Sequence, residues 1–133
     1  RLRDGRNFVD DFARALVNST IIVPVLSADA LQRMRAHDPY QKDHALMEWF
    51  MALECFCSPD SRVARVLPVV FGQRDSSSDA IGNLFAEGLI EELPEIYPKE
   101  TIRSALQLLE ANGVTPRFGV ATYTVRSIVT ELK

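Results

Sequence analysis

Glu48 is the residue whose type and position point most directly to chemistry. It lies within residues 43–57, DHALMEWFMALECFC, which are apolar almost all the way round a helix. A helix that is apolar on every face is normally buried, and a carboxylate in it is costly unless it is paired, neutralised or used. An ionised carboxylate can also stabilise positive charge that develops during a reaction. Glu48 is therefore the first candidate for a catalytic residue.

The helical spacing predicts a small-residue surface around this carboxylate. One face of the helix carries, in order, His44, Glu48, Ala52 and Cys55. A carboxylate above small side chains is what a pocket requires. The pattern alone nevertheless favours the alternative in which Glu48 faces solvent, with His44 or Lys42 as a loose partner. Glu54, near the end of the helix on another face, is expected to be exposed.

Other groupings of reactive side chains are weaker. The atoms for a zinc site are present in Cys55, Cys57, His37 and His44. The two cysteines point to nearly opposite sides of a helix, and the histidines lack the spacing of known zinc sites, so we expect free cysteines and no metal. Ser27, His44 and Asp43 have the residue types of a catalytic triad, but no G-x-S-x-G elbow accompanies them.

A small basic cluster lies at residues 1–6, RLRDGR, where Arg1, Arg3 and Arg6 have the charge to meet a phosphate. A solvated loop is the favoured interpretation. The net charge of the chain is −3 and its pI is about 5.4, which argues against a protein that binds nucleic acid by neutralising phosphates. The composition, 47% apolar and 25% charged, is that of a soluble globular domain.

The remaining composition signals place the chain inside the cell. Its 133 residues suit one domain with a real core. The longest apolar runs, residues 21–26 and 67–71, are far shorter than the roughly 20 residues that span a bilayer. No leader is recognisable, and the two cysteines suggest no disulfide. We expect a cytoplasmic protein.

Helices and strands alternate along the chain, which favours an α/β sheet with helices on both sides. Helices are predicted at residues 8–17, 29–35, 43–57, from 98 to just before Gly113, and after Thr124, with a weaker one at 80–93. Residues 20–26 and 63–71 predict parallel strands with both faces covered, although Pro24 and Pro68 interrupt them. A short edge strand is expected within 114–122. Ligands of such sheets bind beyond the carboxyl ends of the strands, here Ser27 and Gly72.

The predicted strands are too few for a complete sheet of this kind, which usually has about four to six. The chain also opens within a loop. We therefore expect an N-terminal strand–helix–strand unit to lie outside this sequence.

The order of these features resembles that of the Toll/interleukin-1 receptor (TIR) domain family. In that family a glycine-bearing loop leads into a helix, a buried strand ending in serine follows, and then come a helix with a signature glutamate and a strand with Pro-Val near its end. The matching stretches are RLRDGRNFVDDFARALVNSTIIVPVLS, DHALMEWFMALEC and VLPVVFG. The resemblance covers residues 1–72 clearly and 79–133 loosely, so residues 1–133 are expected to form a single, partial TIR domain.

The resemblance implies a flavodoxin-like fold, a three-layer open parallel sheet with helices on both faces, that is incomplete at its N-terminus. Family members either hydrolyse NAD⁺ to nicotinamide and ADP-ribose or its cyclic form, or assemble with other TIR domains without catalysis. In the hydrolases the catalytic glutamate occupies the position of Glu48. Ser27 and His44 would then contact NAD⁺, and the first loop with Arg3, Gly5 and Arg6 would cover it.

His44 is a departure from the family pattern, because hydrolases often carry an aromatic residue, commonly tryptophan, at this position. Histidine stacks on nicotinamide more weakly. We expect NAD⁺ hydrolysis on self-assembly, with NAD⁺ as the substrate, no other cofactor and no metal. The alternative is a non-catalytic module that binds other TIR domains.

Overall fold

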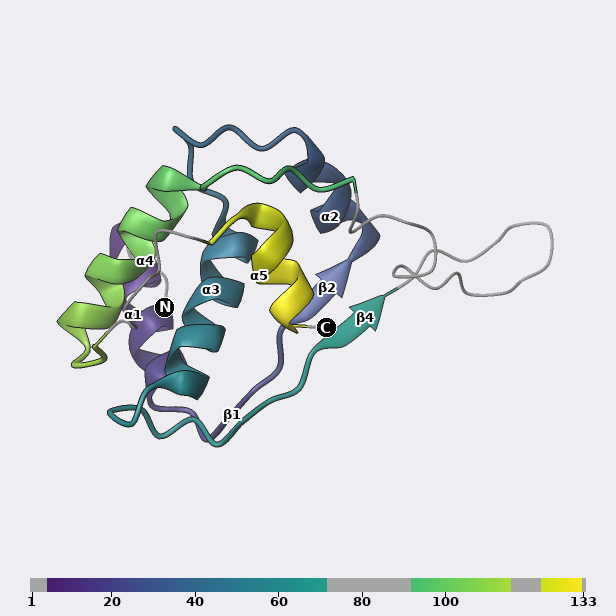
Figure 1. Cartoon of the computed structure of the whole chain (residues 1–133). Helices are drawn as coiled ribbons and strands as arrows, with labels where there is room; N and C mark the ends of the chain where they lie inside the picture. The colour runs from purple at the N-terminus through teal and green to yellow at the C-terminus, as the bar shows by residue number, and fades with distance from the viewer. Residues whose placement is uncertain (1–4, 72–91, 116–122, 133) are drawn as a thin grey trace.

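The structure is a computed structural model of the chain. It describes the backbone of residues 5–71, 92–115 and 123–132, and the side chains of residues 10–69, 92–115 and 123–132. In this part of the chain helices alternate with short parallel strands, which confirms the general α/β class (Figure 1). The elements are α1 (Gly5–Val17), β1 (Ile21–Ile22), β2 (Val25–Ser27), α2 (Ala28–Arg35), α3 (His44–Cys57), β3 (Arg65–Val66), β4 (Val69–Phe71), α4 (Lys99–Ala111) and α5 (Val125–Leu132).

The four described strands form two parallel pairs, one after the other along the same two segments of chain. β1 pairs with β3 and β2 with β4, both parallel, and the offset between partners is the same in each: Ile21 lies opposite Arg65, and Val25 opposite Val69. The carbonyl of Pro24 accepts from Val69 N–H at 2.8 Å, so the nitrogen of Pro24 faces the same neighbouring strand. That nitrogen has no hydrogen to donate, which removes a bond from the ladder and divides the pair in two.

One face of this strand pair is exposed, and the prediction of strands covered on both faces is wrong for it. Ile22, Pro24 and Leu26 are buried, whereas Ile21, Val23 and Val25 are 51%, 46% and 47% exposed. Successive side chains alternate between the two faces of a strand, and only the first set reaches the core that α3 shares. Leu67 and Val69 continue the exposed face on the neighbouring strand.

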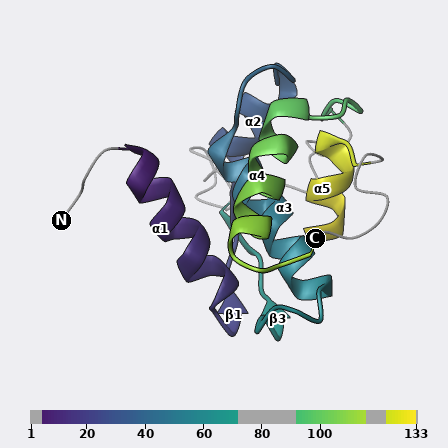
Figure 2. The ribbon, with the colours of Figure 1, turned by 90° about the vertical axis from the view of Figure 1, so that its left-hand side faces the viewer.

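The central helix is α3, and its burial confirms the prediction from its composition. It packs against α4, α5 and β3, as the two ribbon views show (Figures 1 and 2). The buried residues of α3 are Leu46, Met47, Trp49, Phe50, Met51, Ala52, Leu53, Glu54 and Cys55. The helix begins one residue later than predicted, because Asp43 is its N-cap, with the side chain accepting from Leu46 N–H at 3.0 Å.

The last two helices also lie where their apolar spacing predicts them. In α4, Ile102 and Leu109 are buried, Leu106 is half-buried, and Gly113 follows with a positive φ of 80°. In α5 the buried residues are Val125, Ile128, Val129 and Leu132. The short helix expected at residues 29–35 is α2, which begins at Ala28. None of the described helices is long and apolar enough to cross a membrane.

The N-terminal region differs from its prediction. Gly5 and Arg6, expected in a loop, lie in the first turn of α1. Glycine is tolerated there because the first turn of a helix has no intrahelical N–H bonds to support. Arg3 lies outside the described residues. So do most of the helix predicted at 80–93 and most of the strand predicted at 114–122, of which the described ends are irregular.

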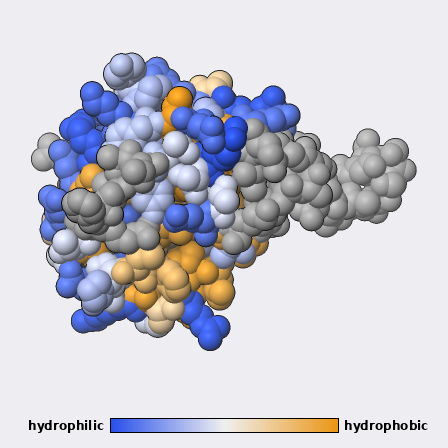
Figure 3. All heavy atoms as spheres, in the orientation of Figure 1, coloured by the Kyte–Doolittle hydropathy of each residue, from blue (hydrophilic) through white to orange (hydrophobic). Residues whose placement is uncertain are grey.

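Hydrophilic and hydrophobic residues are segregated on the surface. Figure 3 shows the upper part of one face covered largely by hydrophilic residues, with hydrophobic residues gathered on the lower part. Large exposed apolar side chains of the described residues include Phe56 at the end of α3 as well as Leu67 and Val69.

Candidate functional site

Glu48 lies in the second turn of α3, between the buried residues Met47 and Trp49, and its side chain is half-buried. Burial raises the pKa of the Glu48 carboxyl above its ordinary value, and no charged or hydrogen-bonding neighbour among the described residues contributes to the shift. Figure 1 shows α3 beginning at the end of the molecule toward which β2 and β4 point. Glu48 is thus a partly desolvated carboxylate in the second turn of α3.

Glu54, the second carboxylate of α3, is fully buried, and the prediction that it is exposed is wrong. It lies on the part of the helix enclosed by the packing of α3 against α4, α5 and β3. It also has interaction partners, as a buried charged group requires. The two glutamates of this helix therefore differ: Glu54 is engaged within the core, whereas Glu48 reaches the surface.

Ser27 lies at the end of β2, as predicted, and is also the N-cap of α2. Its Oγ accepts from Ala30 N–H at 3.2 Å. A serine hydroxyl that accepts in this way still has its own hydrogen to donate. Ser27 is half-buried and does not line the cavity described next.

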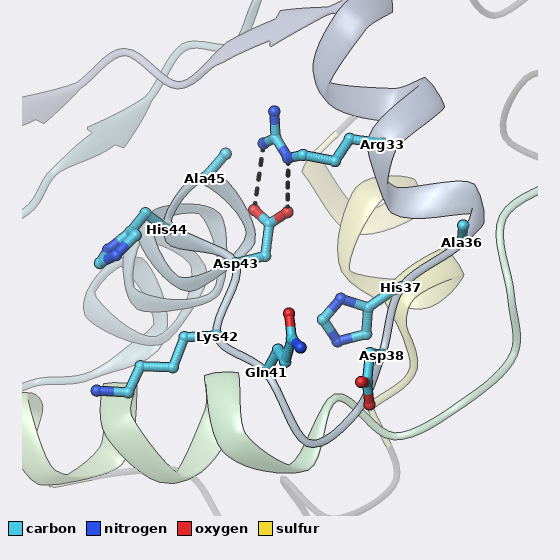
Figure 4. A pocket seen from close by; sticks show the side chains of 9 residues that line it. All are labelled: Arg33, Ala36, His37, Asp38, Gln41, Lys42, Asp43, His44 and Ala45. Carbon is cyan, nitrogen blue, oxygen red and sulfur yellow. Dashed lines mark hydrogen bonds and ion pairs between the residues drawn. The ribbon is translucent and has the colours of Figure 1, made fainter.

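A cavity of about 360 Å³ lies between α2 and the start of α3 (Figure 4). Its lining consists of Arg33, Ala36, His37, Asp38, Gln41, Lys42, Asp43, His44 and Ala45. The volume is within the range of small-molecule sites. His44 is the one predicted site residue that lines it; it is exposed and precedes Glu48 by one helical turn.

Two other predicted site residues do not join this cavity, since Glu48 and Ser27 are absent from its lining. Figure 2 shows the beginning of α1, which contains Gly5 and Arg6, lying apart from α3 and α4. The expectation that these two residues cover the site stays a prediction.

An ion pair between α2 and α3 forms one wall of the cavity. Arg33 Nε lies 3.0 Å from Asp43 Oδ2, and Arg33 Nη2 lies 3.4 Å from Asp43 Oδ1. Burial alone would raise the pKa of Asp43, but the Arg33 guanidinium and the Leu46 N–H hold the pKa below its ordinary value. Asp43 N–H also donates to Thr101 Oγ1 of α4 at 3.0 Å. Asp43 therefore connects three helices.

His37 also lines this cavity, although the sequence indicated it only among the atoms for a zinc site that we did not expect. Its side chain is half-buried, and its Nε2 is buried without a hydrogen-bond partner among the described residues. Burial lowers the pKa of the imidazole, while Asp43 and Asp38 oppose the shift. The sequence carried no signal for this environment, because His37 lies in a connection that has no hydrophobic periodicity.

The cysteines have no catalytic environment. Cys55 is buried, Cys57 is exposed and both are free, as their spacing predicted. Burial raises the pKa of the Cys55 thiol to about 11, so it stays protonated and is a poor nucleophile. The part of the chain that the structure describes contains no cluster of three or more side chains suited to hold a metal ion.

Comparison of the chain with known protein families, with curated proteins and with solved structures finds no match. The fold and the site define a mixed α/β domain with a partly desolvated glutamate on its central helix. Its function is therefore argued from these residues.

Proposed function

We propose that the chain is a TIR-type signalling domain that hydrolyses NAD⁺ to nicotinamide and ADP-ribose, or to a cyclic product, when it self-assembles. Glu48 is the catalytic residue of this proposal. The proposed fold is the flavodoxin-like, three-layer sheet of that family, in which further elements cover the strand face that carries Ile21, Val23 and Val25. The order of α1, β2 with Ser27, α3 with Glu48, and β4 supports the proposal.

The observation that carries the proposal is the environment of Glu48. Its carboxylate is half-buried, burial alone raises its pKa, and no partner among the described residues offsets this cost. A cationic ligand would supply the missing counter-charge, and the nicotinamide ring of NAD⁺ is a cation. Binding of NAD⁺ beside Glu48 would therefore lower the pKa of Glu48 and keep the carboxylate ionised.

One carboxylate is sufficient for the chemistry. When the bond from the ribose C1′ to the nicotinamide nitrogen breaks, the electron pair stays on nitrogen and nicotinamide leaves as a neutral molecule. No general acid is needed, in contrast to ordinary glycoside hydrolysis. The ribose becomes an oxocarbenium-like cation, which the Glu48 carboxylate stabilises until a water molecule adds to C1′ and loses a proton.

Ser27 and His44 have supporting roles in this proposal. The Ser27 hydroxyl has a hydrogen to donate to the substrate while its oxygen caps α2. His44 precedes Glu48 by one turn and is exposed, so its ring is available to stack on nicotinamide bound beside Glu48. The expectation that Arg3, Gly5 and Arg6 cover the substrate stays a prediction, with Gly5 and Arg6 in the first turn of α1.

The test is nicotinamide release from NAD⁺ by the full-length protein at high protein concentration. Glu48→Gln keeps the shape of the side chain and removes its charge, and we expect a loss of about a hundredfold or more in rate. Glu110→Gln, at an exposed position on α4, is the control and should retain activity. No release by the wild type, or equal release by Glu48→Gln, would contradict the proposal.

A non-catalytic interaction module is the second candidate, and the exposed apolar strand face favours it. Its described members are Ile21, Val23, Val25, Leu67 and Val69. Contiguous apolar surface of this kind often marks a protein interface. Sedimentation of Val25→Lys against the wild type tests it: weaker self-association with no NAD⁺ hydrolysis in either protein would favour this function over the first.

A further inference from the structure

His37 occupies a position that suits a neutral imidazole better than a charged one. Its Nε2 is buried and has no hydrogen-bond partner among the described residues. An imidazolium carries a hydrogen on both ring nitrogens and needs an acceptor for each. Protonation would therefore place a donor or a positive charge where the surrounding described residues provide no acceptor at Nε2, and a buried, unsatisfied charged donor is costly.

The segment that holds His37 is fastened to other elements at Pro39 and at Asp43, which also pairs with Arg33. Residues 36–43 connect α2 to α3. Glu100 N–H of α4 donates to the Pro39 carbonyl at 2.9 Å, and Asp43 N–H donates to Thr101 Oγ1 at 3.0 Å. Tyr40 at the middle of the connection is 74% exposed. A segment with few buried apolar contacts opens at a low free energy compared with the core.

Charged groups from three parts of the chain line the cavity with His37. They are Arg33 on α2, Asp38 and Lys42 in the connection, and Asp43 at the start of α3. Two ion pairs lie on the neighbouring elements, Glu100 with Arg103 on α4 and Glu92 with Arg35. Figure 4 shows the His37 ring between Asp38 and the Arg33–Asp43 pair. The two aspartates attract an imidazolium, but Arg33 already occupies the carboxylate of Asp43.

We propose that residues 36–43 form a pH-sensitive connection, in which protonation of His37 releases the segment and opens the cavity beside the start of α3. In the closed form His37 is neutral and half-buried. In the open form its ring is in water, where both nitrogens find hydrogen-bond partners. Acidification therefore favours the open form.

The direction of the His37 pKa shift agrees with opening at low pH. Burial lowers the pKa of His37 below the ordinary value of 6.5 despite the opposing aspartates. The closed form therefore binds the proton less tightly than the open form, and opening increases as the pH falls through 6.5. For the uptake of one proton, the opening equilibrium rises by at most about tenfold per pH unit.

Hydrogen exchange tests this inference in the full-length protein. After correction for intrinsic exchange rates, we expect the amides of residues 36–43 to lose protection severalfold between about pH 7 and about pH 5, with α4 as the internal reference. The chain has two histidines, so His44→Gln is a matched control and should keep the response. His37→Gln remains neutral at every pH and should lose it.

A titration of wild-type His37 by NMR keeps the inference testable even when His37→Gln does not fold. We expect its ring signals to titrate below 6.5. Titration at or above that value would overturn the inference, and so would a pH response that persists in His37→Gln. Because neither measurement involves NAD⁺, failure here is independent of failure of the proposed hydrolysis.

Discussion

Arg33 and Asp43 are joined by two N–H···O contacts, of 3.0 and 3.4 Å, across the boundary between α2 and α3. The same carboxylate accepts from Leu46 N–H in the first turn of α3, and the backbone N–H of Asp43 donates to Thr101 on α4. One aspartate therefore fixes where α3 begins relative to two other helices. The positions of His44 and Glu48 depend on this start, because both follow it on the same helix.

Asp43→Ala should destabilise the protein through loss of the helix cap. Loss of an N-cap typically costs about 0.5–2 kcal/mol. The ion pair between Arg33 and Asp43 adds little to the free energy of unfolding, because the Arg33 side chain is 57% exposed and solvent screens its charge. We expect urea denaturation to show a decrease of about 1–2 kcal/mol in the free energy of unfolding. Asp43→Asn keeps a cap acceptor and should lose less.

Asp38→Ala is the matched control for this prediction. Asp38 is exposed, and its side chain accepts only from Tyr40 N–H, at 2.9 Å, among the described residues. Its removal should change stability by no more than about 0.5 kcal/mol. Equal effects of Asp38→Ala and Asp43→Ala would mean that Asp43 has no special role at the junction.

Glu48→Gln should stabilise the protein at neutral pH. Because burial raises the pKa of Glu48 in the folded state, the folded protein binds this proton more tightly than the unfolded chain. Stability from this group is therefore present at low pH and declines as the pH rises from 4.5 through the folded pKa. Glutamine does not ionise, so Glu48→Gln lacks this decrease in stability with rising pH.

Denaturation at two pH values measures this effect. Glu48→Gln should exceed the wild type in free energy of unfolding near about pH 7 and match it near about pH 3.5. Asp43 has the opposite sign: its pKa is lowered, so its contribution is lost as the pH falls through the folded pKa. A stabilised Glu48→Gln that no longer hydrolyses NAD⁺ would fit a site that sacrifices stability for activity.

Much of the helical architecture could be predicted from the sequence, because helices with strong periodicity carry their own signal. The apolar stripe of α5 and the all-round apolar surface of α3 each specify a buried helix, and both are buried. Such patterns state that a face is covered. They do not state which element covers it.

The wrong predictions concern residues whose burial depends on which other element covers them. Glu54 has the same local sequence character as Glu48, and only the packing of other elements onto α3 makes one buried and the other half-exposed. Val23 and Val25 look like core residues in the sequence, yet the described helices leave them exposed. His37 could not be recognised, because its environment is created by residues from α2, α3 and their connection.

Thr124→Ala should destabilise α5 more than Thr130→Ala. Thr124 Oγ1 accepts from Ser127 N–H at 3.1 Å, and Ser127 Oγ accepts from Thr124 N–H at 2.7 Å, a reciprocal cap on a helix of 8 residues. Its loss should cost about 1 kcal/mol. Thr130 is exposed and its Oγ1 donates to Arg126 O within the helix, so its loss should be nearly neutral.

Chemical denaturation and hydrogen exchange of α5 measure the difference between the two threonines. Faster exchange of the first turn should accompany Thr124→Ala and not Thr130→Ala. If both variants behave as the wild type, the burial of Val125 and Ile128 holds the helix without its cap.

Pro24 and Pro68 lie opposite each other in the strand pair but should respond differently to substitution by valine. The nitrogen of Pro24 faces the neighbouring strand, so Pro24→Val creates an N–H positioned to donate to the Leu67 carbonyl. Leu67 N–H and Val69 N–H face β1 and β2, so the nitrogen of Pro68 points away from them and meets no described partner.

Hydrogen exchange distinguishes the two variants directly. The new amide of Pro24→Val should be protected, and its bond, worth about 0.5–1.5 kcal/mol, should offset the greater freedom of the unfolded chain. The new amide of Pro68→Val should exchange rapidly, and the protein should lose about 0.4–1 kcal/mol. Rapid exchange at position 24 would show that the ladder is divided for a reason other than the missing hydrogen, and protection at position 68 would reveal a further partner at that edge of the sheet.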